Sequence, residues 1–253
     1  MCGCPRKTCW ARKDSGPVPQ GVFVADVGCG SFTALTGILA AVIHRRQTGE
    51  GQFVDVSMFD GALTWNLFAA TQFLVSGESA DYESMFGNGG SPYDYYRTRD
   101  GRYLSVGCIE PRFWCGFCRA IGRPDLESRW EMPGESTAPI KEEIRSIIAQ
   151  KTFDEWRSIF ASEDVCVEPV LTVKEALAHP QTLAREMVVN VPKADGTAQP
   201  QLGCPITFSR SQTEYRHIGA ALGAHTEEVL RETGYSPSEI QVLRDEGVFG
   251  PGQ

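Results

Sequence analysis

Hydrophobic and polar positions follow helical spacing first and strand spacing next. In residues 31–46 the apolar side chains recur at the spacing of one helix face, with Ser31 as the N-cap and basic residues at the end. Residues 53–58 alternate as a strand does, and Asp60 is then placed to cap a second helix that ends near Leu74. The pattern therefore predicts a helix, a strand and a helix.

A second group of elements is predicted after a long Gly- and Ser-rich loop at residues 77–92. Residues 93–98 and 102–109 form a hairpin around an Arg-Asp-Gly turn, and Pro111 favours a helix that starts directly after Glu110. The order is mixed α and β, without the strict alternation of a doubly wound sheet. Further helices are expected at residues 137–150, 153–161, 173–178, 224–233 and 236–245, and a short strand at 166–172.

Composition limits the classes of protein to consider. A chain of 253 residues with 42% hydrophobic and 22% charged residues is ordinary for a soluble globular protein with one or two domains. A net charge of −8 argues against a general nucleic-acid or anionic-membrane surface. No run of about eighteen apolar residues occurs, so no membrane span is expected. The first residues also lack the apolar run of a secretory signal.

The nine cysteines favour a reducing compartment, because their number is odd and their spacing is irregular. This predicts a cytoplasmic protein. The cysteines do not form ligand pairs at the spacing of a zinc site, so no metal site is expected. Residues Trp114 to Cys118 resemble a dithiol redox motif. Because Pro111 opens the helix, Cys115 lies about one turn inside it, where the helix dipole lowers the thiol pKa little. These cysteines are therefore predicted to pack in a core.

Asp26 is the most suggestive carboxylate, since it lies among valines just before Gly28 and Gly30. If the helix starts after these glycines, their backbone amides can bind an oxyanion beside the carboxylate. Asp26 could then serve as a base, an acid or a nucleophile. The alternative is structural: an aspartate that caps the helix and glycines that make the turn. The glycine spacing is not that of a dinucleotide-binding motif.

Glu110 is the second candidate, at the end of an apolar strand and the start of a helix. Strand ends are where sites on α/β scaffolds gather. The alternative is a glutamate that only stabilises the positive end of the helix.

Five stretches together resemble the family III CoA-transferases and, within them, the alpha-methylacyl-CoA racemase branch. They extend from about Ser15 to Gly247 and read ADVGCGSFTALTGILAA, TGEGQFVDVSMFDG, NGGSPYDYYRTRDGRYLSVGCIEPRFW, DVCVEPVLTVKEALAHPQTLAREMV and TEEVLRETGYSPSEIQVLRDEGV. The resemblance implies the family III CoA-transferase fold, which is α/β. Its large Rossmann-like domain contributes both termini, a smaller α+β domain lies between, and two chains interlock as a dimer.

The resemblance also implies a division of this chain. Residues 1–20 are expected to be a poorly ordered start, and residues 21–75 the remaining part of the large domain. Residues 76–202 would form the smaller domain with its linkers, and residues 203–253 the C-terminal return to the large domain. The family's N-terminal CoA-binding part has no match, so we expect an N-terminally truncated member with an incomplete large domain.

By resemblance, Asp26 is the family's catalytic aspartate. In the transferases it is the nucleophile, and in the racemases it acts on the α-carbon proton of a 2-methylacyl-CoA. Glu110 corresponds to a racemase active-site glutamate that supports the acid/base network. The racemases take a second group from a His–Asp element upstream of the aspartate, and none of the 25 residues before Asp26 is a histidine.

Glycines complete the expected site. Gly28 and Gly30 would offer amides to the thioester oxygen of the enolate. Gly89 and Gly90 lie in the stretch that matches the active-site region where transferases often carry a glycine-rich flap.

Three functions stay open. The first is an acyl-CoA racemase or epimerase that interconverts 2-methylacyl-CoA stereoisomers by α-proton exchange. The second is a CoA-transferase that moves CoA between an acyl-CoA and a carboxylic acid, with Asp26 as nucleophile. The third is an inactive fragment or partner subunit. The resemblance implies an acyl-CoA thioester as substrate, coenzyme A as part of that substrate, no tightly bound cofactor, a homodimer and a place in lipid metabolism.

Overall fold

The computed structural model describes residues 11–12, 16–17, 21–80, 90–129, 137–193 and 195–250. The chain divides into two compact units, Met1–Val170 and Leu171–Gln253, which are described separately. The segment expected to be poorly ordered, residues 1–20, lies mostly outside the described residues. Its described part is one antiparallel pair of two-residue strands, β1 (Ala11–Arg12) and β2 (Gly16–Pro17).

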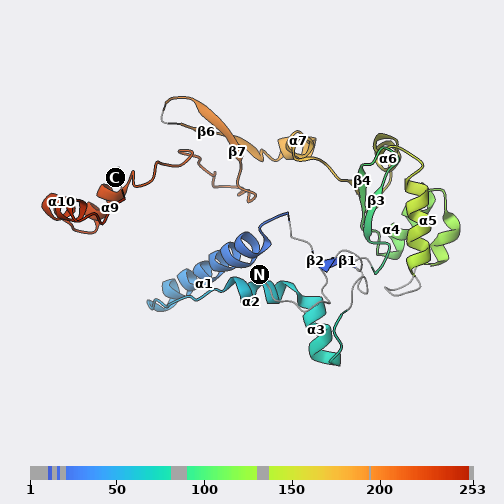
Figure 1. Cartoon of the computed structure of the whole chain (residues 1–253), viewed down its shortest axis with the longest axis horizontal. Coiled ribbons are helices and arrows are strands. Elements are labelled where there is room, and N and C mark those ends of the chain that lie inside the picture. The colour runs from blue at the N-terminus through green and yellow to red at the C-terminus, as the bar shows by residue number, and fades with distance from the viewer. Residues whose placement is uncertain are drawn as a thin grey trace. The chain divides into compact units, whose positions relative to one another are not determined.

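The first long helical segment starts earlier than the sequence pattern predicts. It begins as a π-helix, η1 (Val24–Phe32), and continues directly into α1 (Thr33–Thr48) (Figure 1). The predicted N-cap at Ser31 is therefore wrong, because Ser31 lies inside the helix and its hydroxyl donates a 2.9 Å hydrogen bond to the carbonyl of Asp26. The predicted end is confirmed: Gly49 closes α1 in the left-handed conformation, with φ of 82°.

The second and third helices correct two further predictions. Residues 51–57 carry no strand pairing, so the strand predicted at 53–58 is wrong. Ser57 caps the next helix in place of Asp60, because its hydroxyl oxygen accepts hydrogen bonds from the amides of Phe59 and Asp60. The single helix predicted up to Leu74 is divided at Asn66 into α2 (Met58–Trp65) and α3 (Leu67–Ser76).

Glycines bring α2 into close contact with η1. A Cβ atom on Gly28 would lie 2.7 Å from the ring of Trp65, and one on Gly30 would lie 3.0 Å from Met58 Cγ. A Cβ atom on Gly61 would lie 2.6 Å from the carbonyl oxygen of Cys29. Side chains at these positions would therefore force the two helices apart.

Most apolar side chains of these helices are exposed, Leu74 at 82% for example. The continuous helix Val24–Thr48 is long and apolar enough to cross a membrane by length and composition, and 6% of its most apolar window is buried. The expectation of no membrane span stays a prediction, because a helix can reach this apolar character without a long uninterrupted apolar run. Core helices of soluble proteins and signal sequences pass the same test, so the test alone assigns no membrane segment.

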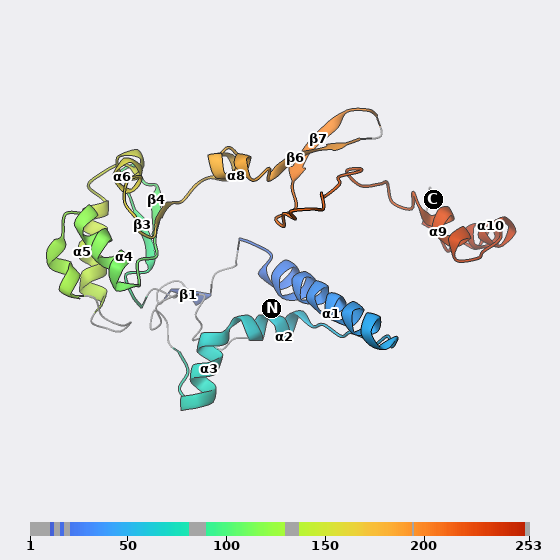
Figure 2. The same cartoon turned by 180° about the vertical axis from the view of Figure 1, so that it is seen from behind.

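The predicted hairpin forms two strands of a three-stranded antiparallel sheet, in which β4 (Tyr103–Val106) lies between β3 (Asp94–Arg97) and β5 (Val167–Pro169). Asp94 pairs with Val106, and Val106 pairs with Val167, so the start of β3, the end of β4 and the start of β5 lie at one end of the sheet. The helices predicted around this sheet are confirmed, and Figures 1 and 2 both show them beside it. The elements are β3 (Asp94–Arg97), β4 (Tyr103–Val106), α4 (Pro111–Ala120), η3 (Pro124–Arg129), α5 (Ala138–Ile148), α6 (Phe153–Phe160) and β5 (Val167–Pro169).

The core of this group lies between the sheet and its helices. The ring of Phe117 on α4 stacks on Phe160 at 6.1 Å, and Phe160 stacks on Trp156 at 5.6 Å. The buried apolar set further includes Tyr96, Leu104, Val106, Trp114, Leu126, Ile144, Ile148 and Phe153. Burial of this apolar set supplies the main driving force that holds the sheet and helices together.

The second unit contains a hairpin that the sequence pattern did not reveal, since its second strand, AQPQL, lacks apolar alternation. Two helices that were predicted near the C-terminus follow it. The elements of this unit are α7 (Val173–Leu177), α8 (Pro180–Ala184), β6 (Val188–Pro192), β7 (Ala198–Leu202), α9 (Thr226–Glu232) and α10 (Pro237–Asp245). The expected mixed α/β class is confirmed, and the strand pairs described are antiparallel.

Candidate active site

Glu110 sits directly at the junction of strand and helix. It is the N-cap residue of α4, with extended backbone angles of φ −81° and ψ 144°, and Pro111 follows it at the first helical position. Its side chain is exposed and makes no capping hydrogen bond to the helix. The carboxylate therefore lies at the positive end of α4 without capping it, and both stabilisation of the helix end and an acid/base role fit this position.

Two residues that the sequence analysis did not single out, Tyr93 and Cys166, flank the strand that leads to Glu110. A Cβ atom on Gly107 would lie 3.3 Å from the ring of Tyr93 and 3.6 Å from Cys166 Cβ. The amide of Gly107 also donates a 2.7 Å hydrogen bond to the carbonyl of Cys166. The predicted hairpin could have indicated Tyr93, because its register places residue 93 opposite residue 107.

The negative charge of Glu110 contributes to a raised pKa at two neighbouring thiols. Burial raises the pKa of Cys108 to about 12, and the negative charges of Cys166 and Glu110 act in the same direction. The pKa of Cys166 is also raised, first by burial and then by the carboxylate of Glu110. Glu110 thus lies close enough to both cysteines to share one electrostatic environment with them.

Gly90 precedes the first strand of this sheet in the chain. It is buried, and its carbonyl accepts a 2.9 Å hydrogen bond from the hydroxyl of Thr137. The structure therefore fixes Gly90, four residues before the start of β3, to the start of α5. Gly89, the other glycine predicted there, lies outside the described residues.

Asp26 lies on η1 in a separate group of elements, and its side chain is exposed. Because the helix begins at Val24, Gly28 and Gly30 fall within the helical segment instead of just before it. Their observed role is to let Trp65 and Met58 pack closely. Their service as oxyanion donors, and the catalytic role of Asp26, stay predictions.

The stretch that resembles a dithiol redox motif packs in a core at Cys118, as predicted. Cys118 is fully buried on α4, and burial raises the pKa of its thiol to about 12. A reactive dithiol needs the opposite, an accessible thiol of lowered pKa. Within the described ranges, no group of three His, Cys, Asp or Glu side chains comes together as metal ligands.

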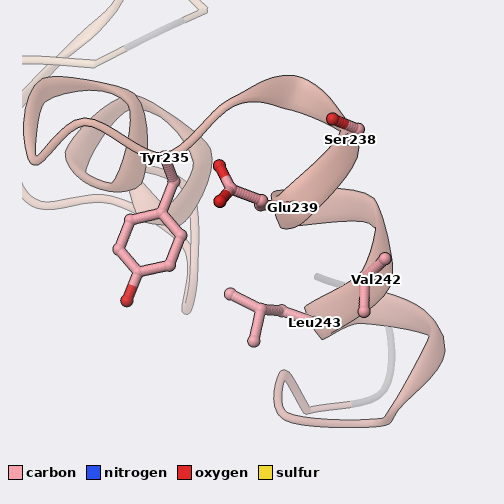
Figure 3. Close-up of a pocket in the computed structure, with 5 residues that line it drawn as sticks. All are labelled: Tyr235, Ser238, Glu239, Val242 and Leu243. Atoms are coloured by element: carbon pink, nitrogen blue, oxygen red, sulfur yellow. The ribbon is translucent and has the colours of Figure 1, made fainter.

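A separate pocket of about 360 Å³ lies in the second unit, at α10. Figure 3 shows Tyr235 and Leu243 facing each other across it, with Glu239 between them. The Glu239 carboxylate accepts hydrogen bonds from the amide and hydroxyl of Ser236, at 2.8 and 2.6 Å, which hold its pKa below the usual value. Glu239 is thus engaged in capping α10, and the pocket offers an apolar wall without a free catalytic group.

Comparison with known proteins relates this chain to a family. The model of CoA-transferase family III matches residues 1–226. Human alpha-methylacyl-CoA racemase is 30% identical over 239 residues, which cover 94% of this chain and 62% of the human protein. Succinyl-CoA:mesaconate CoA-transferase of Haloarcula marismortui is 29% identical over 247 residues, which cover 93% of this chain and 60% of that protein. This chain therefore spans about three fifths of the length of these relatives.

A solved structure agrees with these sequence relationships at the level of the fold. The crystal structure of a CAIB/BAIF family protein from Brucella suis matches with a TM-score of 0.66 and 24% identity, over 90% of this chain and 59% of that one. The fold class expected from the sequence is thereby confirmed. The match of the family model over residues 1–226 shows that the chain belongs to CoA-transferase family III.

Proposed function

We propose that this protein acts on acyl-CoA thioesters as a racemase or epimerase that exchanges the α-proton of a 2-methylacyl-CoA. The observation that carries the proposal is the carboxylate of Glu110, exposed at the start of α4 and free of any capping bond. Similarity to alpha-methylacyl-CoA racemases over 94% of the chain supports the same substrate class.

The chemistry needs a base on one face of the α-carbon and an acid on the other. A carboxylate takes the α-proton, the electron pair moves into the thioester carbonyl as an enolate, and a proton returns to the opposite face. We assign one face to Asp26 and a supporting acid/base role to Glu110. The amides at Gly28, Gly30, Gly89 and Gly90 are the proposed donors to the enolate oxygen. The step consumes and releases one proton, so the proposal includes no tightly bound cofactor.

CoA transfer is the second candidate, favoured by the similarity to succinyl-CoA:mesaconate CoA-transferase and by the exposed carboxylate of Asp26. In this reaction Asp26 attacks the thioester carbonyl, the acyl group forms a mixed anhydride, and CoA leaves as the thiolate. CoA then attacks the Asp26 carbonyl and releases the free acid, and the acceptor acid reacts with the resulting thioester in the reverse order.

The proposal includes a homodimer and a cytoplasmic location. A third possibility is that the chain is an inactive fragment or a subunit that completes its site with a partner. Because this chain spans about three fifths of the relatives' length, the experiment also tests this possibility.

The test is α-proton exchange. The purified chain is incubated with (S)-2-methylacyl-CoA in D₂O, and deuterium at the α-carbon is followed by NMR, with Asp26→Asn as the control. Exchange by the parent that is lost in Asp26→Asn supports the racemase. Absence of exchange together with CoA transfer to a free acid, and an acyl group trapped on Asp26, supports the transferase. Absence of both activities contradicts both enzymes and leaves the inactive fragment or partner subunit.

A further inference from the structure

A polar stripe on one helix, buried at Thr137 and Lys141 and exposed at Arg145, holds the segment that leads into the candidate site. Thr137, Lys141 and Arg145 are spaced four residues apart at the start and along one face of α5. Thr137 donates a 2.9 Å hydrogen bond to the carbonyl of Gly90. Lys141 Nζ lies 2.9 Å from Asp94 Oδ2, and Arg145 lies 3.5 Å from the same oxygen. The stripe thus binds residues 90–94 at both ends, at Gly90 and at Asp94.

The ion pair at the centre of this stripe is deeply buried. The Lys141 side chain is 5% exposed and that of Asp94 is 3% exposed. The other oxygen of Asp94, Oδ1, accepts a 2.8 Å hydrogen bond from the amide of Tyr95. The carboxylate is therefore held by a cation on one oxygen and by the backbone of its own strand on the other.

Stability alone is a weak reason for such a pair. Removing two charges from water costs about as much as their attraction returns, and an apolar pair of similar volume is often as stable. The pair does fix the position of the backbone, because an ion pair with fixed hydrogen bonds defines the path of the chain that carries it. That backbone carries Tyr93 immediately before Asp94, with the Tyr93 ring against Gly107.

We propose that the buried Asp94–Lys141 pair, together with the Thr137–Gly90 bond, is a positioning device that holds residues 90–94 and so sets Tyr93 against Gly107 on the strand leading to Glu110. The inference rests on the proposed function in one respect, because it takes the surroundings of Glu110 as the active site. Asp94, Lys141 and Thr137 are positioning residues that act through Tyr93 and Gly90.

The first test is the double variant Asp94→Leu with Lys141→Met, which replaces the pair by apolar side chains of similar size. Thermal melting reports the fold. Alkylation of Cys108 by iodoacetamide, followed by mass spectrometry of its peptide, reports the packing beside Gly107, because Cys108 is buried and its thiol lies against the carbonyl of Cys166. Cys204 in the second unit is the internal control. We expect melting close to that of the parent, Cys108 labelling faster by at least about fivefold, and Cys204 labelling unchanged.

Two further arms keep the test decisive. If the double variant does not fold, Thr137→Val removes only the bond to Gly90 in an isosteric side chain and is expected to accelerate Cys108 labelling in the same way. If the parent exchanges α-protons, the double variant should lose about tenfold in kcat while KM changes little. A folded variant with parental Cys108 labelling overturns the inference. Because labelling needs no activity, this outcome is distinct from failure of the proposed function, which appears as no exchange by the parent.

Discussion

The backbone amide of Phe153 donates a 3.0 Å hydrogen bond to the carboxylate of Asp100, which lies in the hairpin turn 53 residues earlier. The hydroxyl of Thr98 donates to the same oxygen at 2.6 Å. Phe153 is the first residue of α6, so one carboxylate fastens the β3–β4 turn to the start of that helix. These hydrogen bonds, that of Thr98 above all, hold the pKa of Asp100 below its usual value.

This link predicts a loss of stability in acid. A carboxyl group whose pKa is lowered by folding stabilises the native state fully above its ordinary pKa, about pH 4, and this contribution disappears as the pH falls through the native value. Asp100→Asn should therefore lower the urea midpoint at about pH 7 and leave it nearly unchanged at about pH 2. Asp55→Asn, at an exposed carboxylate, is the matched control. Equal effects of Asp100→Asn at both pH values would contradict the assignment.

Glu110→Gln should separate function from stability. Because the Glu110 side chain makes no capping hydrogen bond, the variant should unfold within about 0.5 kcal/mol of the parent. If Glu110 belongs to the acid/base network, α-proton exchange should fall by about 10²- to 10⁴-fold. Glu168→Gln is the control, since Glu168 is exposed on β5 and its charge also raises the pKa of Cys166. A similar loss in both variants would point to a general effect of charge.

Thiol reactivity should follow burial. With a pKa of about 12, the thiols of Cys108 and Cys118 are about one part in 10⁴ thiolate at about pH 8, and the thiolate is the reactive form. Both should resist alkylation in the native protein and react once urea unfolds the chain. Cys204, which is partly exposed, should react in the native state. Native-state alkylation of Cys118 at the rate of Cys204 would restore the redox interpretation.

Gly61→Ala should loosen the contact between η1 and α2. Its new methyl group would meet the backbone of Cys29 at 2.6 Å, which a side-chain rotation cannot relieve. We expect a loss of about 1 kcal/mol or more in the stability of this contact, seen as faster amide hydrogen exchange in residues 24–32 and 58–65. Gly51→Ala is the control, because no described atom lies within 4 Å of the place its new methyl group would take. Unchanged exchange in Gly61→Ala would show that the helices tolerate separation.

Sequence patterns predicted correctly the elements that a few neighbouring residues determine. The Arg-Asp-Gly turn between two alternating stretches predicted the hairpin, and Gly101 in that turn indeed has a φ of 83°. The predicted start of α6 is correct for the same reason. Thr152 and Glu155 bond each other's backbone at the start of α6, and such a box is visible in four consecutive residues.

The failures have non-local causes. The start predicted at Ser31 is wrong because the helix extends back over Gly28, where the ring of Trp65 from α2 packs. The strand predicted at 53–58 had the right alternation, yet a strand also needs a partner, and sequence alternation does not supply one. In the site, Glu110 was recognised from its own neighbours in the sequence. Tyr93 and Cys166 come beside it only through strand register, which pairs Val106 with both Asp94 and Val167.

The exposed apolar faces of η1, α1, α2 and α3 have a calorimetric consequence. Heat capacity rises on unfolding because apolar groups become hydrated, and side chains such as Leu74 and Val75 are already hydrated in the native state. The unfolding increment should therefore come mainly from the β3–β5 sheet and helices α4, α5 and α6. Binding of any molecule that covers the exposed helices should show a large negative heat capacity change.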